Sequence, residues 1–173
     1  MKQVKRSEIV GFLDIDKASA IADAEWKIFG NGVTTATYSY NPNSESETWI
    51  VEDNARTVLN SYALSIDGEQ TCLFGDAVYD FINGLRYNMA VGDDAITNLL
   101  LVDKYDYTGT GNAREYKAQV FSCVIQVESY GGDGGAKPTI SYTIGVNGDP
   151  VNGTVTISDG VPTFTATATP VSL

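Results

Sequence analysis

The sequence predicts a mainly β protein in which two packed antiparallel β-sheets, in a sandwich- or barrel-like arrangement, carry one flanking α-helix and a projecting hairpin. Ten tyrosines and many threonines and valines favour strands. Turn dipeptides punctuate the second half of the chain, and only one segment has clear helical periodicity. At 173 residues, the chain has room for a single domain over 1–173.

The first half of the chain is expected to contain a long hairpin over residues 38–53. A Thr- and Tyr-rich strand over 34–40 ends at residues 41–44 (NPNS), where proline and the Asn and Ser side chains favour a loop or hairpin tip. The chain then returns through a strand over 47–52. Another strand is predicted over 58–66.

One helix is predicted, over about residues 76–88. Asp76 is suited to cap it, because its carboxylate can accept a backbone N–H of the first turn. A weaker, alanine-rich candidate over 17–26 is either helical or an irregular crossover. The apolar residues at helical spacing on the predicted helix are Ala77, Val78, Phe81, Ile82, Leu85 and Met89.

From residue 97 onward the pattern predicts strands alone. We expect hairpin turns at residues 147–150 (NGDP) and at Asp159-Gly160, because Asn-Gly and Asp-Gly tolerate the positive φ of tight turns. The predicted strands cover 97–107, 113–129, 139–146, 153–158 and 163–168.

Charge excludes several classes of function. The chain has 11 Lys and Arg against 22 Asp and Glu, a formal net charge of -11, and no histidine. Such an acidic chain repels phosphate, which argues against a nucleic-acid binder. Without imidazole there is no Ser-His or Cys-His nucleophile and no common zinc ligand set. We therefore predict no enzyme activity, catalytic residue, metal site or cofactor.

Cysteines and apolar runs indicate the compartment. Cys72 and Cys123 are too few for a disulfide framework and are interpreted as buried thiols. The N-terminus shows no signal-peptide pattern, and no apolar run approaches the roughly 20 residues that cross a bilayer. We expect a protein made in a reducing cytoplasm with no membrane partner.

The remaining candidate sites have competing interpretations. Glu45 and Glu47 share a strand face near Trp49, but in so acidic a chain such pairs are common on the surface. The glycine cluster at 131–135 lacks the spacing of calcium or phosphate loops and is interpreted as a flexible connection. Tyr38, Tyr40 and Trp49 suit self-association, core packing or a sugar-stacking platform, and the sequence leaves these three open.

The N-terminal arm, residues 1–10, concentrates positive charge. Lys2, Lys5 and Arg6 lie within the first six residues of an otherwise acidic chain. They form either a solvated terminus or an arm that contacts the acidic face of a neighbouring copy, in which case the contact would depend on salt.

Short segments in a fixed order across nearly the whole chain carry a family resemblance. Each is a turn or strand fragment, so their joint order is the specific feature. Ala77 stands where the pattern has proline, and residues 17–23 have no clear counterpart. The segments are GFLD (11–14), WKIFGNGVT (26–34), SYNP (39–42), ETWIVEDNA (47–55), EQ (69–70), GDAVYDFI (75–82), LR (85–86), AVGDDA (90–95), GGDGG (131–135), ISYTI (140–144) and GDPVNGT (148–154).

In this order the segments resemble the major tail tube proteins of long-tailed phages and prophages of Gram-positive bacteria. The resemblance implies a structural virion protein, assembled in the host cytoplasm, whose six-fold rings stack into a hollow tube that conducts DNA without binding it specifically. Its implied partners are further copies of itself and the tape-measure, tail-tip or initiator, and tail terminator proteins. The contact residues it implies on the hairpin are Tyr40, Asn41, Pro42, Glu47, Trp49 and Ile50.

Two other functions remain as alternatives to the structural role. A carbohydrate-binding β-sandwich displayed on a virion or cell surface would use Tyr38, Tyr40 and Trp49 as its platform. A glycosidase built on two carboxylates is the third and weakest hypothesis.

Overall fold

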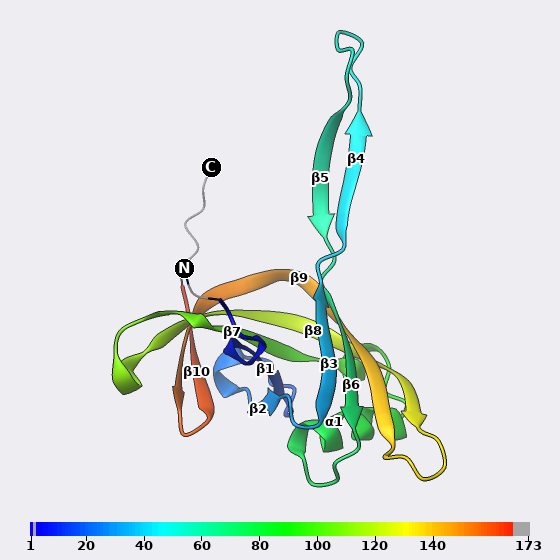
Figure 1. Cartoon of the computed structure of the whole chain (residues 1–173), viewed down its shortest axis with the longest axis vertical. Helices are drawn as coiled ribbons and strands as arrows, with labels where there is room; N and C mark the ends of the chain where they lie inside the picture. The colour runs from blue at the N-terminus through cyan, green and yellow to red at the C-terminus, as the bar shows by residue number, and fades with distance from the viewer. Residues whose placement is uncertain (2, 168–173) are drawn as a thin grey trace.

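The computed structural model describes residue 1 and residues 3–167 and confirms the predicted fold class (Figure 1). An eight-stranded antiparallel sheet has the order β2-β1-β7-β8-β9-β6-β3, with β10 paired to β9, and β4 and β5 form a separate two-stranded sheet. The strands are β1 (Ile9–Asp14), β2 (Trp26–Phe29), β3 (Val33–Ser39), β4 (Pro42–Glu47), β5 (Arg56–Tyr62), β6 (Ser65–Thr71), β7 (Ile96–Thr108), β8 (Glu115–Gly131), β9 (Thr139–Ser158) and β10 (Val161–Ala166).

The large sheet curls because its longest strand, β9, has different neighbours along its length. Its first half pairs with β6 and its second half with β10, while β8 pairs with both halves. The free side of β10 comes into contact with β2 at the other edge of the sheet. The packed layers are therefore parts of one continuous, curled sheet (Figure 1).

The two predicted turns in this region have opposite outcomes. Asp159 and Gly160 do form a tight hairpin turn, with φ of 49° and 83°. The turn predicted at 147–150 is wrong, because β9 continues through these residues. Asn147 pairs with Ser122 and Val151 with Val120, so residues 148–150 form a bulge. The parts of β9 on either side of residues 148–150 both pair with β8, so they continue as one strand.

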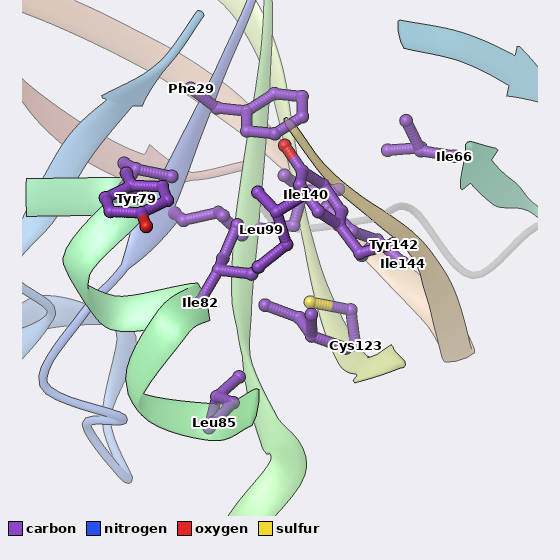
Figure 2. Packing of buried hydrophobic residues seen from close by; sticks show 13 residues of the cluster. Phe29, Ile66, Tyr79, Ile82, Leu85, Leu99, Cys123, Ile140, Tyr142 and Ile144 are labelled. Atoms are coloured by element: carbon purple, nitrogen blue, oxygen red, sulfur yellow. The ribbon is translucent and has the colours of Figure 1, made fainter. Parts of the chain in front are cut away.

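The predicted helix is confirmed as α1 (Ala77–Tyr87). It is the single α-helix among the residues that the structure describes. Asp76 caps it, with a carboxylate oxygen that accepts the Tyr79 N–H at 2.9 Å. Figure 2 shows the buried side chains of α1 facing strand residues of the large sheet. The buried residues of the helix are Val78, Tyr79, Ile82 and Leu85.

The core lies on both faces of the central strands. Leu99 of β7 belongs to the cluster under α1, whereas its neighbour Leu100 belongs to a second cluster on the opposite face, as strand alternation requires. The second cluster includes Phe12 and Trp26, with Phe164 of β10 packed against it. Burial on both faces makes these central strands the core of the molecule.

The crossover between β1 and β2 is irregular and contains only a 3-10 turn, Ile21–Asp23. Asp14 organises it from a fully buried position. Its carboxylate accepts the N–H of Ala18 at 2.8 Å, the N–H of Glu25 at 3.0 Å and the amide of Asn98 at 3.1 Å. These bonds satisfy the backbone of the crossover without a helix.

The hairpin is displaced along the chain from its predicted position. Residues 41–44, predicted as a tip, lead directly into β4, and the strand predicted over 47–52 does not form. The actual tip lies in residues 48–55, and the strand predicted over 58–66 is divided into β5 and β6. The physical reason is that β3 pairs with β6 while β4 pairs with β5, so the chain changes sheets at the NPNS segment instead of reversing there.

Candidate assembly interface

The hairpin formed by β4 and β5 projects from the body of the molecule along its longest axis, and α1 lies toward the opposite end (Figure 1). Every residue of β4 and β5 is exposed. A two-stranded hairpin without further packing is marginally stable in water. A hairpin of this kind gains stability when another surface covers it.

The two faces of the hairpin differ in charge, since residues paired across the strands share a face. One face carries the pair Ser46 and Thr57 together with Leu59 and has no charge. The other face carries the pairs Glu45–Val58 and Glu47–Arg56. The hairpin therefore offers one neutral side and one largely acidic side.

The tip concentrates apolar side chains. Ile50 is fully exposed and Val51 is 85% exposed. Trp49 is half-exposed, with the Arg56 guanidinium 3.6 Å from the centre of its ring. Arg56 is also paired with Glu52, whose backbone N–H bonds to the Trp49 carbonyl at 2.9 Å. These contacts hold the tip in shape while its aliphatic residues remain in water.

The base of the hairpin is held by Asn41, which has a left-handed φ of 42°. Its side-chain amide donates to the carbonyl of Ala63 at 3.0 Å and to the hydroxyl of Ser65 at 3.1 Å. Beside it, the rings of Tyr40 and Tyr62 meet edge to face, with centroids 6.2 Å apart. Asn41 thus bonds the strand leaving the body to the strand returning to it.

The hairpin residues that the sequence predicts as contacts lie in two different places in the structure. Tyr40, Asn41 and Pro42 lie at the base, and Trp49 and Ile50 lie at the tip, beyond the six residues of β4. Six residues of strand span about 20 Å. Glu47 ends β4 and faces Arg56. The role of these residues in contacts between copies stays a prediction.

The N-terminal residues are partly engaged within the chain. Lys2 lies outside the described residues. The Lys5 backbone N–H donates to Glu8 at 2.9 Å, and the Arg6 guanidinium donates to the Ile9 carbonyl at 2.7 Å. Arg6 also lies 5.5 Å from the centre of the Tyr38 ring. Contact of Lys2, Lys5 and Arg6 with a neighbouring copy stays a prediction.

Sequence reasoning missed several exposed apolar residues. Val51 and Tyr62 extend the apolar surface of the hairpin, and Phe74, in the loop before α1, is 97% exposed. The Leu73-Phe74 pair next to a glycine, between a strand and a capped helix, was the available signal. Its exposure depends on the loop geometry, which has no sequence signature.

Metal-ligating side chains do not gather in the described part of the chain. Residues 1 and 3–167 contain no group of three or more acidic, His or Cys side chains that could hold a metal ion. Burial raises the pKa of the Cys123 thiol to about 12, so it stays protonated. Over the same residues, no helix is long and apolar enough to cross a membrane.

No known protein family matches the sequence, and no curated protein matches it. Among solved structures, the chain is similar to one described as the tail of an empty GTA particle, obtained with helical refinement and C6 symmetry. The TM-score is 0.60 at 10% sequence identity, and the match covers 86% of this chain and 97% of the other. The two chains share a fold. The match lends no support to the narrower expectation of a Gram-positive bacterial host.

Proposed function

We propose that this chain is the major subunit of a tail tube. Six copies assemble into a ring, and the rings stack into a hollow tube through which DNA passes. The observation that carries the proposal is the match of nearly the whole chain to a tail protein solved with C6 symmetry. The resemblance described above adds support from the order of segments along the sequence.

The exposed hairpin fits this role. An unpartnered pair of strands with an apolar tip is suited to bury its surface against another subunit. In an assembly of identical copies, that subunit is a second copy of the chain. Tyr40, Asn41, Pro42, Glu47, Trp49 and Ile50 are the hairpin contacts we propose, with Lys2, Lys5 and Arg6 as secondary ones.

The acidic composition also fits the passage of DNA. A wall with attractive charge would hold the phosphates, whereas a net charge of -11 per subunit favours a wall that repels them. Replacement of acids that face the channel by lysine should leave assembly intact and slow the release of DNA. Normal release from such tubes would contradict the electrostatic part of the proposal.

The carbohydrate-binding alternative has less geometric support. Its platform needs all three aromatic rings side by side. Tyr38 and Tyr40 line one pocket near the base of the hairpin, but Trp49 lies at the tip under Arg56. The structure therefore does not bring the three rings together. Their separation favours contacts spread along the hairpin.

A shortened hairpin tests the proposal. In the variant, residues 44–60 are replaced by Asn-Gly, so that a two-residue turn joins the paired residues Asn43 and Ser61 and leaves the body unchanged. We expect the parent protein to form rings or tubes in electron micrographs of concentrated samples, and the variant to remain folded but fail to stack. A parent protein that stays monomeric at every concentration, even with tail-tip components, would contradict the proposal. The control for folding is the circular dichroism spectrum of the variant.

A further inference from the structure

A groove at the C-terminal end of α1 has the properties of a receptor for the hairpin tip. It has a volume of about 520 Å³ and lies between the end of α1, residues 89–92 and β8. Its lining is largely aliphatic, and Met89 and Val91 at its rim are strongly exposed. The aliphatic residues lining it include Leu85, Ala90, Val91, Val124, Ile125 and Val127.

The charge of the groove complements that of the tip. Arg86 is the one charged residue that lines it, and no acidic residue does. The Arg86 guanidinium lies 4.1 Å from the centre of the Tyr130 ring, and its Nε donates to Asn83 at 2.9 Å. The tip has Ile50 and Val51 flanked by Glu47, Glu52 and Asp53; Arg56 pairs with Glu52, so the acids remain in excess. The tip therefore offers an aliphatic core with mainly acidic flanks, and the groove offers an aliphatic lining with one basic residue.

A second groove, at the base of the hairpin, is larger but less suitable. It has a volume of about 810 Å³ and includes Tyr40, Tyr62 and Asp149 in its lining. Asp149 would oppose the acidic flanks of the tip, because like charges brought together in an interface are costly. The groove at the end of α1 has no acid in its own lining, and Asp94 in the adjoining groove is accompanied by Lys17.

The tip cannot reach the groove at the end of α1 within one chain, because the two lie toward opposite ends of the long axis (Figure 1). We propose that residues 49–51 of one copy occupy the α1 groove of the next copy. A contact between two different patches on identical chains is heterologous, so each copy can join two neighbours, and the copies form a closed ring or an open stack according to the rotation between them. This inference rests on the proposed self-assembly and identifies the surface that receives the hairpin.

Disulfide cross-linking between copies tests the contact. In a Cys72→Ala background, which leaves only the buried Cys123, one chain carries both Ile50→Cys and Val91→Cys. Mild oxidation should give a ladder of covalent oligomers, since each copy joins to two neighbours. A mixture of the two single variants should stop at dimers. The control chain carries Ile50→Cys and Val161→Cys, with Val161 exposed at the start of β10.

The yield of the Ile50→Cys and Val91→Cys pair should exceed that of the control pair by at least about tenfold, because docking raises the effective thiol concentration. Arg86→Glu in the same background should lower the yield severalfold. Equal yields for the two pairs would overturn the proposal. A higher yield from Ile50→Cys with Ser61→Cys, which probes the groove at the hairpin base, would also overturn it.

Electron micrographs of the same samples separate this inference from the proposed function. Tubes without the cross-link to Val91→Cys would overturn the groove assignment and leave the tube function standing. Cross-linked filaments without a channel would support the groove assignment and contradict the tube function. Monomers that neither cross-link nor assemble would contradict both.

Discussion

At the scale of single residues, Asn41 and Asp14 show how polar side chains shape irregular backbone. Asp14 is buried and accepts two backbone N–H groups of the crossover that follows β1 and the side-chain amide of Asn98 in β7. Asn41 is exposed, yet its amide joins the two strands at the base of the hairpin. Neither role is visible in the sequence, because the partners of each residue are distant or lie in irregular segments.

Two variants of Asn41 separate its backbone role from its amide. Asn41→Gly adopts the left-handed φ freely but removes the side-chain bonds, whereas Asn41→Ala removes the same bonds and keeps a Cβ that costs about 1–2 kcal/mol in this conformation without the local hydrogen bonds that let asparagine tolerate it. We expect faster hydrogen exchange at Ala63 in both variants, and lower thermal stability in Asn41→Ala than in Asn41→Gly. Unchanged exchange at Ala63 in both would show that the amide does not hold the hairpin base.

Burial of Cys123 predicts a pH dependence of stability. Burial raises its pKa from 9.0 to about 12, so the folded state favours the thiol. This contribution is fully present below pH 9 and is lost as the pH rises from 9 toward 12. Cys123→Ala should be less stable at pH 8 because of the cavity, yet lose less stability than the parent between pH 9 and 11. Urea unfolding at several pH values measures this, and parallel pH profiles would refute it.

At the scale of elements, the sequence was informative where local chemistry decides the structure. The capped helix α1 and the Asp159-Gly160 turn were predicted because their signals are local. The Asn-Gly at 147–148 and the NPNS segment carry the same kind of signal, but strand pairing with distant residues overrides it. The sequence singled out Trp49 and Ile50 as candidate contacts, which stay a prediction, and their place at the tip depends on a register that only the fold sets.

Replacement of two glycines by alanine should change the stability of the protein in opposite directions. A Cβ added to Gly68 of β6 would lie 2.6 Å from the Tyr142 ring. Gly68→Ala should therefore destabilise the protein by about 1–3 kcal/mol through overpacking. A Cβ at Gly84 of α1 meets nothing within 4 Å, so Gly84→Ala should stabilise it by about 0.5–1 kcal/mol. Chemical denaturation measures both, and changes of the same sign would contradict the packing described here.

At the scale of the whole molecule, the acidic net charge opposes assembly, whereas the apolar hairpin tip and the aliphatic groove of α1 favour it. A net charge of -11 keeps separate copies apart, whereas the apolar tip and the aliphatic groove favour head-to-tail contact. Assembly therefore requires the apolar contact to outweigh the charge repulsion between copies.

Salt should therefore promote assembly. Screening shortens the reach of the repulsion from about 10 Å at 0.1 M salt to about 3 Å at 1 M, while burial of apolar surface is retained. We expect the sedimentation coefficient of concentrated protein to rise with salt. A fall with salt would instead indicate that attraction by Lys2, Lys5, Arg6 or Arg86 dominates, and would contradict this balance.

Cryo-electron microscopy of the concentrated, purified protein tests the central claim most directly. We expect stacked rings with six-fold symmetry around an open channel, and each hairpin extending from its own ring to the next. Particles that remain monomeric, or that assemble without a channel, would contradict it.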